Sequence, residues 1–186
     1  MTKRTIILLA LLCTTLGAIA QDKVRNISVE ALGAQNTIGI NYDTRLHGNS
    51  GWGYRIGIGF GYSYADSFFE ETTIKGVGIP LEMNYLFGKK NSKLEVGVGT
   101  SIGVYRIKEG LAFYYESTPE HPEGIFETHY NNDTRFGYFF FGNIGYRYQR
   151  PNGFVFRTGF TPSFSMGKCG LARSFFYPYI SFGWSF

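Results

Sequence analysis

Cysteine is nearly absent from this chain of 186 residues, which holds only Cys13 and Cys169. Cys13 lies in an apolar N-terminal segment that we expect to be removed, so a single thiol remains afterwards. One thiol excludes an intramolecular disulfide and a cysteine-based metal cluster.

Long apolar runs are scarce as well, and the one at the N-terminus has the three parts of an export signal. Lys3 and Arg4 form its basic part and Ile6–Leu12 its apolar part. Small residues suited to cleavage follow at Ala18–Ala20. We therefore predict a signal peptide over residues 1–20. Its apolar part is too short to span a bilayer, and no apolar run of about twenty residues follows it.

Charge is sparse too, since Asp, Glu, Lys and Arg make up 17% of the chain. We predict that residues 21–186 form a single barrel domain. Without Lys3 and Arg4, this part carries 16 basic and 14 acidic residues. Because basic and acidic residues are nearly equal in number, the charge gives no reason to expect a nucleic-acid partner.

Aromatic residues and glycine are plentiful instead: Phe, Trp and Tyr make up 18% of the chain, and there are 25 glycines. Between Gly51 and Tyr64 large apolar residues alternate with small ones. Successive side chains of a β-strand point to opposite faces, so this segment predicts a strand with one apolar face. That face consists of Trp52, Tyr54, Ile56, Ile58, Phe60, Tyr62 and Tyr64.

The same alternation recurs along the chain and predicts eight strands. We therefore predict an all-β fold, an eight-stranded antiparallel transmembrane up-and-down β-barrel. The predicted strands are residues 27–33, 37–46, 51–64, 74–87, 93–107, 135–149, 153–164 and 176–186.

The predicted connections differ in length at the two ends of this barrel. Short segments that contain the turn-forming residues Gly, Asn, Ser or Pro lie at residues 47–50, 88–92 and 150–153. Longer polar loops lie at residues 65–73, 108–134 and 166–174. Outer-membrane barrels keep their short turns on the periplasmic side and their long loops outside. The short turn Gly33–Asn36 is the exception, because it lies at the long-loop end.

The apolar face of the strands is expected on the outside of the barrel. A soluble barrel such as a lipocalin would turn this face inward. The interior of an eight-stranded barrel is only wide enough to be filled by side chains, and eight aromatic and aliphatic rows would overfill it. Rows of Gly, Ser, Thr and Asn have the right size. Aromatic residues also gather near the short-turn ends, where a membrane–water girdle would lie.

The last third of the chain contains the stretches Asn143–Gly153 and Phe156–Pro162 and a C-terminal strand, Tyr177–Phe186, that ends on an aromatic residue. These segments resemble small eight-stranded outer-membrane β-barrel proteins of Gram-negative bacteria. The resemblance implies an outer-membrane location and recognition of the strand ending at Phe186 by the barrel-assembly machinery. That family carries no assigned chemistry, so the resemblance implies no catalytic residues.

Charged side chains occupy the small, polar rows that we expect to face the barrel interior. A buried charge is costly unless it is paired, so these residues predict an ion-pair network that fills the lumen. The alternative is a gated polar path, which so narrow a barrel disfavours. The predicted network comprises Glu30, Asp43, Arg45, Arg55, Glu82, Glu95, Arg147 and Arg157.

Three basic residues, Lys75, Arg106 and Lys108, have the lipid-facing parity and lie near the long-loop ends. Long basic side chains at a membrane interface can reach phosphate groups, so we predict contacts to lipopolysaccharide. Ordinary interfacial placement is the alternative.

The predicted loop 108–134 is rich in acidic residues, histidine and tyrosine. Carboxylates and imidazoles are metal ligands, but their spacing here forms no tight ligand set. A solvated charged loop and a surface recognition loop are the other interpretations, and a protein, an ion and a glycan stay open as its ligand. The residues concerned are Glu109, Tyr114, Tyr115, Glu116, Glu120, His121, Glu123, Glu127, His129, Tyr130 and Asp133.

Motifs of catalysis and cofactor binding do not stand out. Some small outer-membrane barrels modify lipid A with Ser and His, but His47, His121 and His129 share no strand face with a candidate serine. We therefore predict a monomeric, non-enzymatic barrel without cofactor and without a large pore, with a structural or adhesive role. Its predicted partners are outer-membrane lipids and lipopolysaccharide. A lipid A-modifying enzyme and a narrow channel are the alternatives.

Overall fold

The computed structural model describes residues 24–66, 70–88, 90–115, 125–166 and 177–186, and the predicted signal peptide lies outside this part of the chain. Apart from one 3-10 helix, η1 (Gly33–Gln35), the described elements are strands. No helix among the described residues is long and apolar enough to cross a membrane. The strands are β1 (Arg25–Leu32), β2 (Ile38–Arg45), β3 (Gly51–Asp66), β4 (Glu70–Phe87), β5 (Ser92–Tyr115), β6 (Ile125–Gln149), β7 (Phe154–Phe160), β8 (Ser163–Phe164) and β9 (Pro178–Ser185).

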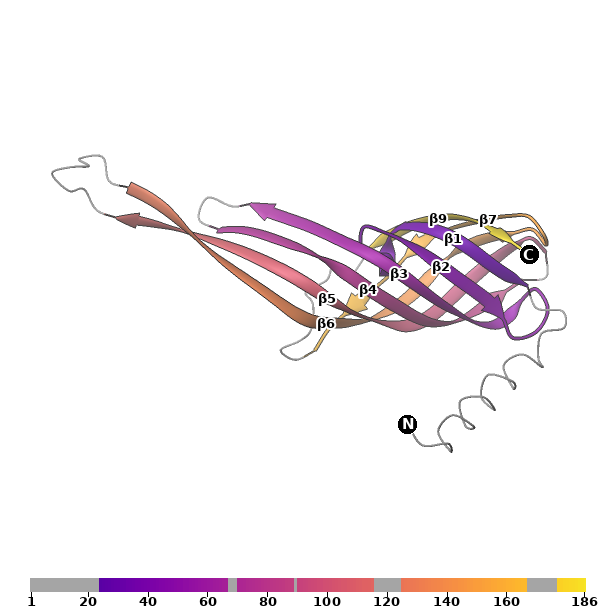
Figure 1. Cartoon of the computed structure of the whole chain (residues 1–186). Coiled ribbons are helices and arrows are strands. Elements are labelled where there is room, and N and C mark those ends of the chain that lie inside the picture. The colour runs from indigo at the N-terminus through magenta and orange to yellow at the C-terminus, as the bar shows by residue number, and fades with distance from the viewer. Residues whose placement is uncertain (1–23, 67–69, 89, 116–124, 167–176) are drawn as a thin grey trace, which may run out of the picture.

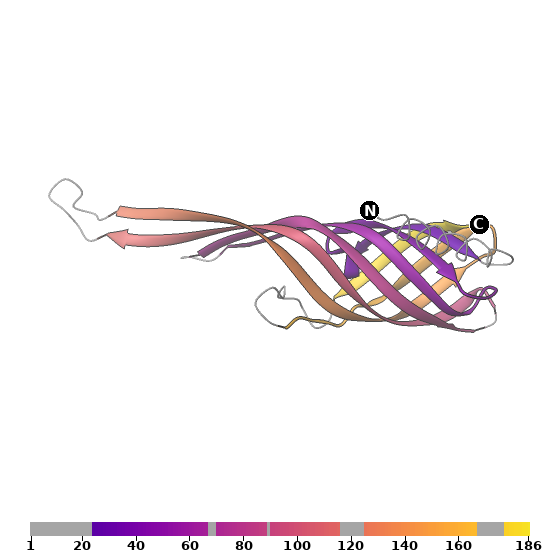
Figure 2. The same ribbon diagram turned by 60° about the horizontal axis from the view of Figure 1, so that its bottom comes forward.

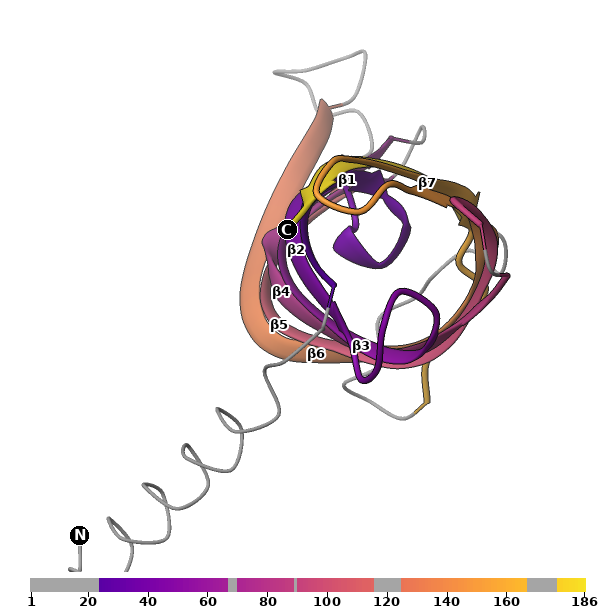
Figure 3. The same cartoon turned by 90° about the vertical axis from the view of Figure 1, so that its right-hand side faces the viewer.

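Strands that follow one another in the chain pair antiparallel, from β1 and β2 through to β5 and β6. β6 then pairs with β7, β7 with β9, and β9 with β1, which closes a ring of eight strands. The short β8 continues the β7 segment along β6. Figure 1 shows the barrel from the side, and Figure 3 shows the closed ring from one end. The predicted all-β, antiparallel up-and-down barrel is confirmed.

The wall of the barrel is apolar outside and polar inside, as predicted. On β3 the exposed fractions of Trp52, Ile58 and Phe60 are 54%, 56% and 46%, whereas Arg55 on the same strand is 4% exposed. This alternation follows from the pleat of the strand, which sends successive side chains to opposite faces. A soluble barrel with its large apolar side chains inside is therefore excluded.

Two predicted loops are largely strand. The prediction of a loop over 108–134 is wrong, because β5 continues to Tyr115 and β6 begins at Ile125, with backbone pairing between those two residues. The predicted loop 65–73 is likewise shortened by the ends of β3 and β4. In Figures 1 and 2 the β5–β6 hairpin extends far beyond the other strands.

The predicted strand 153–164 is interrupted near its end, between β7 and β8. Pro162 lies at the break, and proline has no N–H to donate to a sheet. Its carbonyl oxygen still accepts a hydrogen bond from the Gly142 backbone N–H at 2.8 Å. The prediction of one unbroken strand is therefore wrong at this proline, although the chain keeps its course in the wall.

The connection between β1 and β2 folds into the barrel. Leu32, Gly33 and Asn36 have φ angles of 65°, 59° and 67°, in the left-handed region that side chains disfavour. These angles turn the chain inward, so that Ala34 and Gln35 of η1 are 1% and 0% exposed. In Figure 3 this indigo turn lies inside the ring. The sequence predicted a short hairpin here and carried no sign of the inward turn.

Candidate functional site

Eight charged side chains point into the barrel, and the structure brings the whole predicted set together there. Six strands contribute one each, and β2 contributes two. Each of these residues is at most 4% exposed. Four are arginines and four are carboxylic acids, so their formal charges cancel. They are Glu30, Asp43, Arg45, Arg55, Glu82, Glu95, Arg147 and Arg157.

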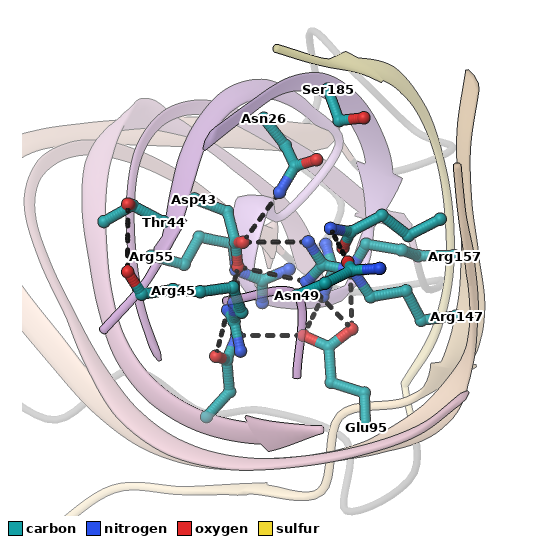
Figure 4. A network of polar contacts seen from close by, with 12 residues as sticks. Asn26, Asp43, Thr44, Arg45, Asn49, Arg55, Glu95, Arg147, Arg157 and Ser185 are labelled. Atoms are coloured by element: carbon teal, nitrogen blue, oxygen red, sulfur yellow. Dashed lines mark hydrogen bonds and ion pairs between the residues drawn. The ribbon is translucent and has the colours of Figure 1, made fainter. Parts of the chain in front are cut away.

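Asp43 is the centre of the first group of contacts (Figure 4). Arg147 donates two hydrogen bonds to its carboxylate, from Nη2 to Oδ1 at 2.8 Å and from Nη1 to Oδ2 at 3.1 Å. Arg45 donates from Nη2 to Oδ2 at 2.7 Å. The side-chain amides of Asn26 and Asn84 donate at 3.1 and 3.2 Å. A two-pronged arginine contact with further donors satisfies both oxygens of the buried carboxylate.

Arg157 is the centre of the second group. It donates to Glu95 from Nε to Oε2 at 2.8 Å and from Nη2 to Oε1 at 3.0 Å. Its remaining terminal nitrogen, Nη1, donates to Glu30 Oε2 at 2.9 Å. Arg55 also donates to Glu30 Oε2 at 2.9 Å, and it forms an ion pair with Glu82. Each carboxylate of this group therefore faces at least one guanidinium.

Two side chains link the groups. Asn84 donates to Asp43 and also to Glu95 Oε1, the latter at 2.9 Å. Arg147 Nη1 lies 3.6 Å from Glu95 Oε2. The charges therefore form one network that crosses the barrel from β1 to β7. Within it, the removal of one member would leave its partners buried and unpaired, which is the costly case for buried ions.

Glycines on the inner face provide room for this network. A Cβ atom added at Gly53 would overlap the guanidinium group of Arg45, and one added at Gly97 would overlap the carboxylate of Glu82. The interior of so small a barrel is filled by its own side chains. The charged side chains therefore lie against the inner face of each strand, where the residues are small.

The end of the barrel that carries the short turns is closed by Asn49, from the turn between β2 and β3. Its Oδ1 atom accepts hydrogen bonds from Lys93 Nζ at 2.8 Å and from Gln149 Nε2 at 2.9 Å. These contacts hold the turn across the mouth of the barrel. Figure 4 shows Asn49 over the charged side chains.

The opposite end is filled by η1 and by three aromatic side chains. Ala34 packs in one cluster with Tyr105, Phe139 and Phe141, all at most 3% exposed. The Tyr105 hydroxyl also accepts a hydrogen bond from Asn36 Nδ2 at 3.3 Å. A water-filled path would leave the charged side chains accessible to solvent, and their burial shows that no such path runs along this network.

The described residues include no group of three or more His, Cys, Asp and Glu side chains that could hold a metal ion. Their two histidines lie at opposite ends of the molecule, His47 in the turn after β2 and His129 near the start of β6. The charged network consists of ion pairs between side chains of different strands. Several acidic and histidine residues of the predicted loop 108–134 lie outside the described residues, as does the remaining cysteine: Glu116, Glu120, His121, Glu123 and Cys169.

The three predicted lipid-contacting cations are divided by the structure. Lys75 on β4 and Arg106 on β5 are directly paired and exposed on the outer wall. Lys108 instead lies over the ring of Tyr130, with its Nζ atom 3.8 Å from the ring centroid. The C-terminal Phe186 is 51% exposed, and its backbone pairs with that of Arg25.

Buried amide side chains are the part of the site that sequence reasoning missed. Asn84 and Asn143 donate to the carboxylates of the network, and Gln149 holds the turn at the mouth. A signal for them was present, because these amides follow the parity of the charged rows. Asn84 comes two positions after Glu82, and Gln149 two positions after Arg147.

No protein-family model and no curated protein matches the sequence. Among solved structures, the chain is similar to the N-terminal β-barrel domain of OprF from Pseudomonas aeruginosa, with 11% identity, a TM-score of 0.49, and coverage of 89% of this chain and 98% of that one. It is also similar to CarO of Acinetobacter baumannii (10% identity, TM-score 0.39, coverage 88% and 96%). A third is Ail, the attachment invasion locus protein of Yersinia pestis (10% identity, TM-score 0.38, coverage 88% and 93%). Identities this low carry no function from those proteins to this chain.

Proposed function

We propose that the chain is an outer-membrane β-barrel, closed to solutes, that recognises other molecules at the cell surface. The recognising part is the projecting hairpin, by which we mean residues 109–115 of β5 and 125–131 of β6. The barrel acts as a monomeric anchor, without cofactor or catalytic step. Its last strand, which leads to Phe186, is the segment through which the assembly machinery inserts it.

The outer wall of the barrel supports a location in lipid. Large apolar side chains are exposed around the wall, for example Val98 at 68% and Trp184 at 59%. Only a closed barrel pairs all its strands, which is what a sheet needs where no water can satisfy the backbone. At the short-turn end, Trp52 and Tyr85 contact edge to face at 5.1 Å. Aromatic rings of this kind form the interfacial girdle of outer-membrane barrels.

The lengths of β5 and β6 are the observation that carries the proposal. These strands have 24 and 25 residues, whereas β1 and β2 have 8 each. A strand crosses a bilayer in about 9–11 residues. More than half of β5 and of β6 therefore extends outside the membrane. The paired strands there are not needed to close the barrel and can contact other molecules.

The surface of the projecting hairpin suits a macromolecular ligand. Leu111 and Phe113 are each 46% exposed on one face. The ring of Phe113 contacts that of His129 at 5.4 Å. Exposed apolar and aromatic side chains beside groups that form hydrogen bonds are typical of protein interfaces. Leu111, Phe113 and His129 belong to a shallow hollow of about 460 Å³ on the projecting hairpin. The hollow is lined by Glu109, Leu111, Phe113, His129, Tyr130 and Asn131.

Removal of the projecting hairpin tests this function. Lys108 and Asn132 are directly paired, so an Asn-Gly turn can join them in place of residues 109–131. In nanodiscs, the intact protein should retain ligands from an array of extracellular glycoproteins and glycans, and the shortened protein should not. The double variant L111T/F113T should lose the same ligands with its hairpin intact. Equal retention by all three proteins, or by none, would contradict the proposal.

A folding control separates this result from damage to the barrel. The shortened protein should keep the shift in gel migration between unheated and heated samples, because the ring of eight strands is untouched. Mass spectrometry of lipid A from cells that express the intact chain tests the enzymatic alternative. A changed lipid A mass would favour that alternative over surface recognition.

A further inference from the structure

Two basic side chains on the outer wall face each other directly, Lys75 on β4 and Arg106 on β5. Both are exposed. Side chains directly opposite on an antiparallel pair have Cβ atoms about 4.5–5.5 Å apart, and like charges placed there destabilise the sheet. Among the described residues, no carboxylate forms an ion pair with either one. An anion bound between the two cations would relieve this repulsion.

The two cations lie at the edge of the apolar wall. On the same outer face, two residues from these cations toward the short-turn end, a row of exposed apolar side chains runs across four strands from β3 to β6. A step of two residues is about 7 Å along a strand, so the cations lie at headgroup depth when this row lies in hydrocarbon. The row consists of Phe60, Val77, Val104 and Phe136, with exposed fractions of 46%, 47%, 57% and 52%.

Lys108 lies one row further from the apolar wall and has other contacts. It is paired with Thr73 across the sheet, and its ammonium group lies over the Tyr130 ring. The hydroxyl of Tyr130 in turn donates to Glu71 Oε2 at 3.3 Å. Lys108 is therefore part of the hairpin's own contacts, and the anion site consists of Lys75 and Arg106.

We propose that Lys75 and Arg106 bind the phosphate group of an anionic membrane lipid, whose acyl chains lie over the apolar row below them. A guanidinium donates two parallel hydrogen bonds to phosphate, and an ammonium adds a point charge. Free phosphate would share these polar contacts but gain nothing from the apolar row. The inference rests on membrane insertion as proposed above.

Native mass spectrometry of the detergent-solubilised barrel tests this site. The protein is titrated with lipid A that carries its phosphates and with the same lipid after chemical dephosphorylation. The unmodified protein should retain the phosphorylated lipid in preference. K75T/R106T should lose affinity by about fivefold for each cation removed, and K75R should keep it. The matched control K90T/R150T removes two exposed charges at the opposite end of the barrel and should bind as the unmodified protein does.

Three outcomes would overturn the site: equal retention of both lipids, equal affinity of K75T/R106T and the unmodified protein, or displacement of the lipid by an equal concentration of inorganic phosphate. Membrane insertion is checked separately, by protease protection of each variant in liposomes. A protein that does not insert overturns the proposed membrane barrel. A protein that inserts but does not prefer the phosphorylated lipid overturns the lipid site alone.

Discussion

Arg157 donates three hydrogen bonds to two buried carboxylates, those of Glu95 and Glu30. Replacement by methionine keeps a long side chain but leaves both carboxylates without this partner. Because an uncompensated buried charge is costly, R157M should lower the free energy of unfolding by about 3–5 kcal/mol. Urea titration of the barrel in detergent micelles, followed by tryptophan fluorescence, measures this loss.

Two further variants identify the cause of that loss. Arg150 is exposed in a turn, so R150M should change the free energy of unfolding by no more than about 0.5 kcal/mol. The double variant R157M/E95Q removes a charge of each sign and should lose less than the two single variants together. Strictly additive losses would contradict an ion-pair origin.

At the scale of elements, the projecting hairpin is tied to β4 by the hydrogen bond from the Tyr130 hydroxyl to Glu71 Oε2. The negative charge of Glu71 opposes formation of a tyrosinate and raises the pKa of Tyr130 above its ordinary value. E71Q removes this charge, so the Tyr130 pKa should fall back toward the ordinary value. NMR titration of the protein labelled with 13C-tyrosine measures this, and Y130F identifies the resonance. An identical titration in E71Q would mean that the contact is not kept.

Strand prediction succeeded where one face of a strand is apolar over many residues, and it failed along the part of β6 in the projecting hairpin, where both faces are polar. On β3 every second residue is large and apolar, so the pattern was visible. Over residues 127–134 of β6 neither parity is apolar, and side chains of both parities are exposed. Backbone pairing continues there without a hydrophobic period. The inward turn at η1 depends on positive φ angles at Leu32 and Asn36, which the pattern of residues does not predict.

Parity also predicted which charged side chains meet in the interior, but not how they pair. The inward rows bring Glu30 and Arg157 to one face of the sheet, and that much follows from alternation alone. Their contact depends on the relative register and tilt of strands that are neighbours only after the ring closes. The amides that complete the network, such as Asn84, share its parity and were passed over because they carry no charge.

At the scale of the whole molecule, the buried charged network crosses the barrel between the Asn49 contacts at one end and the cluster around η1 at the other. In planar bilayers the protein should therefore show no stable conductance steps, with an open porin in the same bilayer for comparison. Q35A should not open it either, because the charged network beneath η1 stays in place. Steady conductance in the unmodified protein would contradict a closed barrel and favour a narrow channel.

The ion pairs of the interior join segments that are remote in the chain. Arg147 and Asp43 are separated by 104 positions, and Arg157 and Glu30 by 127. While the polypeptide is being delivered, these groups are neutralised by water rather than by one another. In the membrane barrel proposed above, a partly paired sheet would carry these charges into lipid without their partners, which is energetically costly. We therefore expect the first strand to pair with the last in the same step in which the barrel enters lipid. An intermediate whose barrel is not yet closed should not accumulate.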